Sequence, residues 1–182
     1  MEPLTGKTVT STRIHDGERI SLRVDEFTLG DRPAVSKEIV EHPGSVVILP
    51  VTSDDHVILV RQWRQPAGQI LLEAPSGTRE PGEDPMVTAH RELREETGFA
   101  AESMSSLGGM WVAPGYSAEY THAFLASDLH ESPLPQDAGE DIHVQKLPLA
   151  SIPEMIRNGD LQDQMTVATF YAASHLLGRG AA

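Results

Sequence analysis

Residues Gly77 to Phe99 read GTREPGEDPMVTAHRELREETGF, a loop rich in glycine and proline that is followed by a helical pattern. Asp84 and Pro85 are typical of a helix start, because aspartate caps free backbone N–H groups and proline fits the first turn. Gly98 is typical of a helix end. The stretch therefore predicts one helix over residues 85–97, directly after the loop.

Three glutamates, Glu92, Glu95 and Glu96, stand at positions i, i+3 and i+4 of this helix. Like charges at these spacings destabilise a helix by about 0.2 to 0.5 kcal/mol per pair, so a positive charge is expected to offset them. Glu92 and Glu96 fall on the flank of the apolar stripe, where carboxylates are poorly hydrated. Arg91 and Arg94 fall on the other side of the helix, and we expect them to be poorly placed to neutralise both.

The chemistry of these side chains limits what could bind there. Hard oxygen ligands, with no cysteine and no paired-histidine motif, favour Mg²⁺ or Mn²⁺ over Zn²⁺. A cluster of solvated surface carboxylates is the alternative to a metal site, and the spacing alone does not decide between the two.

The composition excludes several classes of protein. The chain has 182 residues, 39% of them hydrophobic, which suits one principal domain. Its net charge of −13 argues against a broad nucleic-acid surface. The chain has no cysteine, which fits a reducing compartment. No apolar run reaches the length of a membrane span and no secretion signal is recognisable at Met1, so we expect a cytoplasmic protein that has no membrane partner.

The rest of the chain predicts an α/β protein with a mixed sheet. Alternating residues from Lys7 to His42 predict two or three antiparallel strands, and we assign residues 1–44 to an N-terminal β extension. Residues 45–182 are assigned to the main domain. Further strands are expected at 46–51, 57–63, 69–73, 106–112, 120–126 and 142–147, with helices opening at Ser151 and spanning 165–177.

The stretch from Gly77 to Phe99 resembles the Nudix hydrolase box, and every fixed position of the box is filled. These positions are Gly77, Glu83, Arg91, Glu92, Leu93, Glu95, Glu96, Gly98 and the apolar Phe99. The resemblance implies the Nudix fold, a mixed β-sheet sandwiched between helices. It also implies cleavage of a nucleoside diphosphate linked to another moiety, with Mg²⁺ as cofactor and Mn²⁺ as a possible substitute. Glu83 and Arg91 are expected to hold the loop to the helix through an ion pair.

Segments outside the box resemble the ADP-ribose pyrophosphatase branch of this family. Pro114 stands fifteen places after Phe99, the position whose proline marks that branch. The branch implies hydrolysis of ADP-ribose to AMP and ribose 5-phosphate, by a homodimer built through the N-terminal strands. Three further segments carry the resemblance, at residues 41–44, 60–64 and 72–77.

The box also implies a metal site. Glu92 and Glu96 are expected to be the principal ligands, with Glu95 assisting and the carbonyl of Ser76 completing the shell. Their task is to gather positive charge beside two phosphoryl groups.

The resemblance implies a catalytic set of Glu96, Glu95 and Glu140. Glu140 lies in the loop at residues 137–140, which resembles a segment that supplies a catalytic glutamate in such enzymes. A loop carboxylate could reach the attacking water when substrate is bound. Glu119 is the competing base, and an ordinary solvated loop glutamate is the alternative for Glu140.

Substrate contacts are expected from five residues. Arg64, with Arg61 as the less favoured candidate, would grip the diphosphate, because a planar guanidinium can bind it through two hydrogen bonds. The alternative for each is an arginine at a strand end that extends into solvent. Glu73 resembles an acid near the substrate or metal in relatives, although it could equally pair with a neighbouring arginine. Gly115 and Tyr116 belong to the loop that contains the branch-marking proline. Tyr116 could stack on a base, and packing in the core is the alternative.

Two alternative functions stay open. The first is a Nudix hydrolase of another nucleoside diphosphate sugar or dinucleotide, such as GDP-mannose, UDP-glucose, FAD or NADH. The second belongs to a different class, a nucleotide-sensing module without turnover. A complete set of glutamates argues against the second alternative, because a sensor does not need metal ligands.

Overall fold

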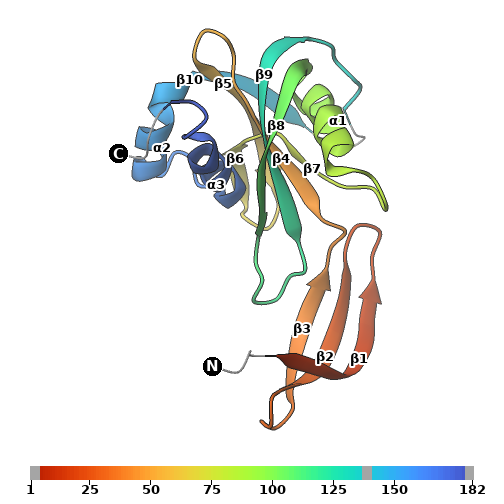
Figure 1. Ribbon diagram of the computed structural model, residues 1–182. Coiled ribbons are helices and arrows are strands. Elements are labelled where there is room, and N and C mark those ends of the chain that lie inside the picture. Colours follow the sequence, from red (N-terminus) through yellow and green to blue (C-terminus); the bar gives the residue numbers. More distant parts are fainter. Residues whose placement is uncertain (1–4, 137–140, 179–182) are drawn as a thin grey trace. The chain divides into compact units, whose positions relative to one another are not determined.

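A computed structural model describes residues 5–136 and 141–178 of the chain (Figure 1). The chain forms two compact units. The first, here called the N-terminal unit, comprises Met1–Gly44 and Trp111–Tyr120, and the second, here called the core unit, comprises Ser45–Met110 and Thr121–Ala182. Residues 111–120 were assigned from sequence to the main domain, but they group with the N-terminal strands. The division into a dimerisation segment and a hydrolase domain stays a prediction.

The N-terminal unit contains a three-stranded antiparallel sheet, as the alternating pattern predicts. Its strands are β1 (Gly6–Asp16), β2 (Ser21–Leu29) and β3 (Val35–Glu41), in the order β1-β2-β3. Asp25, which is 6% exposed, is the one buried residue of these three strands. This sheet therefore has almost no apolar interior of its own.

Ion pairs and hydrogen bonds join the three strands on one face. Asp25 Oδ1 accepts from Ser11 Oγ at 2.6 Å and from Arg23 Nε at 3.0 Å. Arg23 also pairs with Glu41, and Arg13 Nη1 lies 2.6 Å from Glu41 Oε2. One polar network thus connects all three strands, where a hydrophobic cluster would be usual.

The core unit contains two sheets and the helices. The strand orders are β10-β5-β6 and β7-β4-β9-β8, and β4 runs parallel to β9 and antiparallel to β7, so the sheet is mixed. The strands are β4 (Ser45–Pro50), β5 (His56–Arg64), β6 (Gln69–Glu73), β7 (Ser76–Thr78), β8 (Phe99–Trp111), β9 (Tyr120–Glu131) and β10 (Ile142–Pro148). The helices are α1 (Pro85–Thr97), the short 3₁₀ helix η1 (Leu149–Ser151), α2 (Ile152–Asn158) and α3 (Gln164–Ala173).

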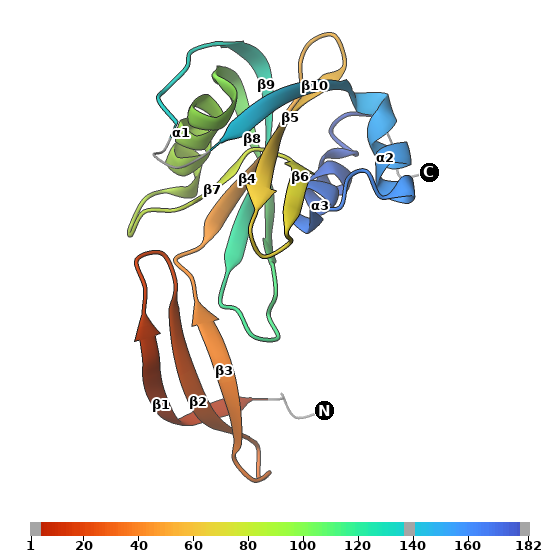
Figure 2. The ribbon, with the colours of Figure 1, turned by 180° about the vertical axis from the view of Figure 1, so that it is seen from behind.

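Strand β4 lies at the centre of the core unit, and all six of its residues are buried. On one face Val46 and Ile48 pack in a cluster with Leu93 of α1. On the other face Val47 joins a second cluster, which includes Ile152 of α2 and Phe170 of α3. The predicted sandwich of a mixed sheet between helices is therefore confirmed (Figure 2).

Helix α1 has the predicted bounds, and its ends explain why. Asp84 Oδ1 accepts from the Met86 N–H at 2.8 Å, and Pro85 occupies the first turn. Gly98 has φ 79°, a left-handed conformation that favours glycine, and its N–H donates to Arg94 O at 3.1 Å. The chain then enters β8 at once, which places the glutamates of α1 beside the sheet.

Two strands are longer than predicted, and one strand was not predicted. Strand β8 begins at Phe99, seven residues before the expected start, and β9 extends to Glu131. Residues 99–105 (FAAESMS) contain no β-branched side chain, so their pairing with β9 rather than local preference makes them a strand. The short β7 was not predicted, and it forms because Ser76 and Thr78 pair with β4.

The last helix is also shorter than predicted, since α3 ends at Ala173 and not at residue 177. In the part of the chain that the structure describes, no helix is both long enough and apolar enough to cross a membrane.

Candidate active site

Helix α1 carries Glu92 and Glu96 at the edge of the core, as the helical spacing predicts, and Glu95 is also partly shielded there. The side chains of Glu92 and Glu95 are largely shielded from solvent, and Glu96 is only 4% exposed. Leu93, between them in sequence, is fully buried against β4. Carboxylates at such a boundary require partners, because a buried charge is costly unless it is paired or hydrogen-bonded.

Arg91 supplies the positive charge, and the expectation that it points away from the glutamates was wrong. Its Nη1 lies 2.7 Å from Glu92 Oε1 and 2.9 Å from Glu95 Oε2. Its Nη2 lies 3.3 Å from Glu83 Oε2, so the predicted ion pair between loop and helix is present. The long arginine side chain extends around the helix to Glu92 and along the helix to Glu95. The prediction considered only the direction of the Cα–Cβ bond and not the length of the side chain.

The titration of Arg91 and Glu83 reflects this network. Burial opposes the charged guanidinium, but the carboxylates of Glu83, Glu92 and Glu95 outweigh it and raise the pKa of Arg91 above its usual value. Burial likewise opposes the charged form of Glu83. Hydrogen bonds from Arg91 and from the Glu80 N–H outweigh that effect, and the pKa of Glu83 lies below its usual value. Both groups are therefore held in their charged forms.

Glu96 is held by the loop that precedes the box. Its Oε2 accepts a hydrogen bond from the Ser76 N–H at 2.9 Å. The neighbouring Pro75 carbonyl accepts from the Ile48 N–H of β4 at 2.9 Å, which fixes the loop to the central strand. Glu96 and the backbone of Ser76 are thus brought together, as a shared metal site requires.

Gly77 lies directly against Glu92. A Cβ atom built at Gly77 would lie 2.0 Å from Glu92 Cδ, a separation that two carbon atoms cannot adopt. The missing side chain is therefore what allows the Glu92 carboxylate to approach β7. This contact gives a physical reason for glycine at the first position of the box.

The donor set fits a hard divalent cation in its chemistry. Glu92, Glu95 and Glu96 offer carboxylate oxygens from one helix, and Gly77 provides the space beside them. Across residues 5–136 and 141–178, no three histidine, aspartate or glutamate side chains are already arranged as a coordination set. Arg91 and the Ser76 N–H engage the carboxylates instead.

Arg64 and Glu73 form a close pair at the ends of β5 and β6. Arg64 Nε lies 3.0 Å from both Glu73 oxygens, and Nη2 lies 2.5 Å from Oε2. The pKa of Arg64 is raised, first by these bonds against the effect of burial, and also by the charges of Glu96 and Asp163. Glu73 therefore pairs with an arginine, which was one of its two expected roles, and it holds Arg64 near Glu96.

Arg61 does not share this position. It lies three residues before Arg64 on β5, and side chains of a strand alternate between its two faces, so the two arginines point to opposite faces. Arg61 is exposed and stands opposite His143 of β10 and Leu72 of β6.

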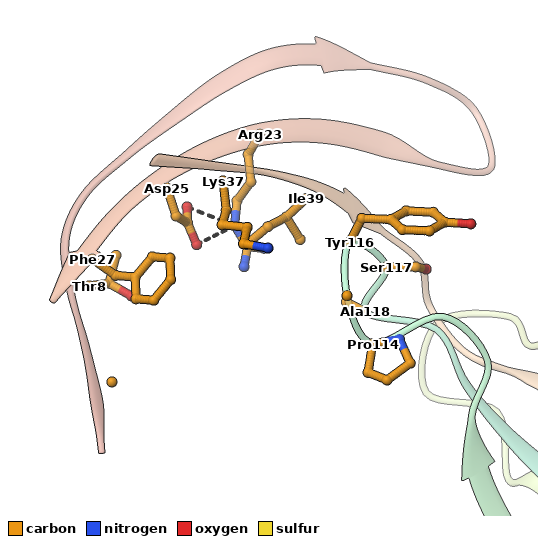
Figure 3. Close-up of a pocket in the computed structure, with 12 residues that line it drawn as sticks. Thr8, Arg23, Asp25, Phe27, Lys37, Ile39, Pro114, Tyr116, Ser117 and Ala118 are labelled. Carbon is orange, nitrogen blue, oxygen red and sulfur yellow. Dashed lines mark hydrogen bonds and ion pairs between the residues drawn. The ribbon is translucent and has the colours of Figure 1, made fainter. Parts of the chain in front are cut away.

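Gly115 and Tyr116 belong to the N-terminal unit, where they line a cavity of about 440 Å³ (Figure 3). The cavity is also lined by Arg23, Lys37 and Phe27 of the three-stranded sheet. Two backbone hydrogen bonds hold this loop to β3, from the Val40 N–H to Tyr116 O at 2.8 Å and from the Ala118 N–H to Val40 O at 2.9 Å.

Of the two candidate bases, Glu119 lies within the described residues and Glu140 does not. Glu119 lies in the N-terminal unit, where its backbone N–H donates to Ser117 Oγ at 3.1 Å. Glu140 lies outside the described residues, so its predicted role as base stays a prediction.

Sequence reasoning missed two features of the site. The first is Arg91 as the partner of Glu92 and Glu95, which the i, i+4 spacing of Arg91 and Glu95 could have indicated. The second is the contact between Gly77 and Glu92, which brings together residues fifteen positions apart and leaves no local signal.

Comparison with known proteins defines the class to which this fold and site belong. The NUDIX domain matches residues 41–167, and the chain belongs to this family. NUDIX hydrolases generally depend on a divalent metal ion. The predicted family is thereby confirmed.

Individual relatives extend the match to nearly the whole chain. The ADP-ribose pyrophosphatase of Bacillus subtilis (strain 168) is 34% identical over 178 residues, which cover 97% of this chain and 95% of the relative. The methanol dehydrogenase activator of Bacillus methanolicus is 34% identical, covering 88% of each chain. The crystal structure of an ADP compounds hydrolase matches with a TM-score of 0.85 at 23% identity, covering 98% of this chain and 97% of that chain, and this shows the shared fold.

Proposed function

We propose that the chain is a NUDIX pyrophosphohydrolase that cleaves the pyrophosphate bond of ADP-ribose. Water adds to one phosphorus, the P–O bond of the bridging oxygen breaks, and the products are AMP and ribose 5-phosphate. The observation that carries the proposal is the close approach of Glu92 and Glu96 to the backbone of Ser76 and Gly77. The choice of ADP-ribose rests on two relatives that are named ADP-ribose pyrophosphatase and that match most of this chain.

The metal proposed for this site is Mg²⁺, with Mn²⁺ as a substitute, held by Glu92, Glu96, Glu95 and the Ser76 carbonyl. When bound, such an ion neutralises charge on a diphosphate and lowers the pKa of a coordinated water. The chain's own residues set the conditions for this. Arg91 contacts one carboxylate oxygen each of Glu92 and Glu95, and it competes with any cation for these oxygens.

The diphosphate is proposed to contact Arg64, with Arg61 as the less favoured candidate. The Arg64 side chain is 38% exposed, so it stays accessible to a phosphate while Glu73 fixes its orientation. Gly115 and Tyr116 are proposed to contact another part of the substrate. Glu140 is proposed as the base that accepts a proton from water, and Glu119 is its competitor.

Incubation with ADP-ribose and Mg²⁺ tests the activity, with AMP measured by chromatography. We expect AMP and ribose 5-phosphate in equal amounts, and no product in the presence of a chelator. GDP-mannose, UDP-glucose, FAD and NADH are compared under the same conditions. If one of these compounds is hydrolysed faster than ADP-ribose, it becomes the proposed substrate. Tight nucleotide binding without any hydrolysis would favour the sensing module.

The candidate bases are separated by matched substitutions. Glu140→Gln is expected to lower kcat about 10²- to 10⁴-fold, the usual contribution of a general base, while Glu119→Gln leaves kcat nearly unchanged. The reverse result would assign the role of base to Glu119.

We also propose a homodimer formed through the N-terminal unit. Three strands with a single buried residue have little to stabilise them alone, and burial against a second copy would supply it. Light scattering at micromolar concentration is expected to give twice the mass of 19.8 kDa. A monomer would contradict this proposal without affecting the chemistry. A cytoplasmic location stays a prediction that cell fractionation can test.

A further inference from the structure

The start of helix α3 carries two polar side chains, Asp163 and Thr166, that are hydrogen-bonded to each other. Asp163 caps the helix, and its Oδ2 accepts from the Thr166 N–H at 2.7 Å. The same oxygen lies 2.6 Å from Thr166 Oγ1. A carboxylate can only accept, so the single hydroxyl proton of Thr166 is committed to Asp163.

The Thr166 Oγ1 atom can then act only as a hydrogen-bond acceptor, and it accepts from a residue far away in sequence. The Ala74 N–H donates to Thr166 Oγ1 at 2.7 Å, across 92 positions of sequence. Thr166 is 1% exposed, so water cannot replace this bond. A hydroxyl that donates to a charged group becomes a stronger acceptor, which strengthens the hold on Ala74.

Ala74 stands in the middle of the segment that builds the candidate active site. Before it, Glu73 binds Arg64, and after it the Ser76 N–H binds Glu96. Pro75 lacks an N–H, so Ala74 and Ser76 supply the only backbone donors between Glu73 and Gly77. A shift of Ala74 therefore moves Ser76, and with it the partner of Glu96.

The charges around Arg64 agree with this connection. Asp163 raises the pKa of Arg64, after the larger effect of Glu73 and together with Glu96. The charge of the Asp163 carboxylate therefore acts on Arg64 in the candidate active site, although helix α3 contributes none of the motif residues. The N-terminus of α3 supports the site through a hydrogen bond and through charge.

We propose that Thr166, oriented by Asp163, is a positioning residue that fixes the Ala74–Ser76 backbone and so sets the geometry of the Glu96 carboxylate. This rests on the proposed function of Glu96 as a metal ligand. A residue that acts through such an intermediate typically changes metal affinity or activity 10- to 100-fold when it is replaced.

Helix α3 offers a matched control one turn away. Thr169 is also fully buried, but its Oγ1 has no hydrogen-bond partner among residues 5–136 and 141–178. Thr166→Val and Thr169→Val remove the same hydroxyl from the same helix at the same depth. Only the first substitution breaks the connection to Ala74.

The test measures Mn²⁺ affinity by electron paramagnetic resonance and exchange of the amide hydrogens of residues 73–77 by mass spectrometry. For Thr166→Val we expect about a tenfold weaker Mn²⁺ affinity and faster exchange. Thr166→Ser, which keeps the hydroxyl, should restore both, and Thr169→Val should match the unaltered protein. Equal behaviour of Thr166→Val and Thr169→Val in both measurements would overturn the proposal.

A second variant and the choice of measurements guard against an ambiguous result. If Thr166→Val does not fold, Asp163→Asn takes its place, because asparagine still caps the helix but is a weaker acceptor for the hydroxyl. The same outcomes then apply. Neither measurement needs turnover, so an unaltered protein that fails to cleave ADP-ribose would contradict the proposed function alone and leave this inference to the Mn²⁺ and exchange data.

Discussion

Two strands of this chain show opposite ways of being held in place. Strand β4 of the core unit is buried along all six residues, with helix side chains packed on both faces. Strand β1 of the N-terminal unit is exposed along all eleven residues, and it is joined to its neighbours by the network around Asp25. The first strand is stabilised by apolar burial, and the second by charge and backbone pairing.

The contrast separates rigidity from adaptability. A core filled on both faces allows little movement, which suits residues that must hold Glu92 and Glu96 in fixed positions. A sheet held by ion pairs responds to pH and salt, which would suit the proposed dimer surface. Four experiments test whether the two units differ in this way.

The largest effect is expected at the core unit's own carboxylates. Glu96→Gln removes a charge from the proposed metal site, and we expect kcat to fall about 10²- to 10⁴-fold with an unchanged circular dichroism spectrum. Glu102→Gln, at an exposed glutamate on β8, is the control and should keep full activity. An unchanged rate for Glu96→Gln would mean that the metal site is misplaced.

Packing should dominate stability in the core unit but not in the N-terminal unit. Leu93→Ala leaves a cavity between α1 and β4, and it is expected to lower the free energy of unfolding by about 2 to 5 kcal/mol. Val9→Ala on β1, where the side chain is 57% exposed, should change it by less than about 0.5 kcal/mol. Urea unfolding measures both. Similar losses at the two positions would remove the proposed contrast.

Glycines in the two units should respond differently to an added methyl group. Gly77→Ala forces the Glu92 carboxylate aside, and we expect about 1 to 3 kcal/mol of destabilisation together with weaker Mn²⁺ binding. At Gly6 on β1, a Cβ would meet its nearest neighbour, Leu29 Cδ2, at an ordinary 3.5 Å. Gly6→Ala should therefore leave the midpoint of thermal unfolding nearly unchanged. Equal losses would show that the close approach of Gly77 and Glu92 is not real.

Acid should loosen the N-terminal sheet with the smallest effect of the four. The hydrogen bond from Ser11 and the pairing with Arg23 lower the pKa of Asp25 from its usual 3.8, against an opposing effect of burial. A carboxyl whose pKa is lowered by folding stabilises the folded state above its unfolded pKa, and this contribution is lost as the pH falls below that value.

Hydrogen exchange at pH 5 and pH 3 measures this loss. Residues 6–41 should exchange faster at the lower pH, after correction for the intrinsic rates, while β4 stays protected. Asp25→Asn should remove most of the pH dependence of residues 6–41. A pH response of the same size in β4 would contradict the assignment to this network.

The sequence was most informative where local chemistry decides the structure. Asp84, Pro85 and Gly98 fix both ends of α1, and the predicted bounds are confirmed to the residue. Strand β6 was also predicted exactly as the structure has it, because Gln69–Glu73 is bounded by turn residues. Local signals of this kind need no knowledge of the rest of the chain.

Two of the misses occur where partners distant in sequence decide, and a third concerns the reach of one long side chain. Residues 99–105 of β8 have no β-branched side chain, and their pairing with β9 makes them a strand. Arg91 was assigned to the wrong side because its Cα direction was considered without the length of its side chain. The bond between Thr166 and Ala74 spans 92 positions, so no pattern within one element could indicate it.

Arg91 has a consequence for the protein in the absence of divalent ions. Its guanidinium already contacts carboxylate oxygens of Glu92, Glu95 and Glu83, so these three side chains have a cationic partner without an added metal ion. Treatment with EDTA should therefore abolish catalysis reversibly and leave the melting temperature almost unaltered. The metal-free protein would then be folded but inactive, and added Mg²⁺ would restore activity without refolding.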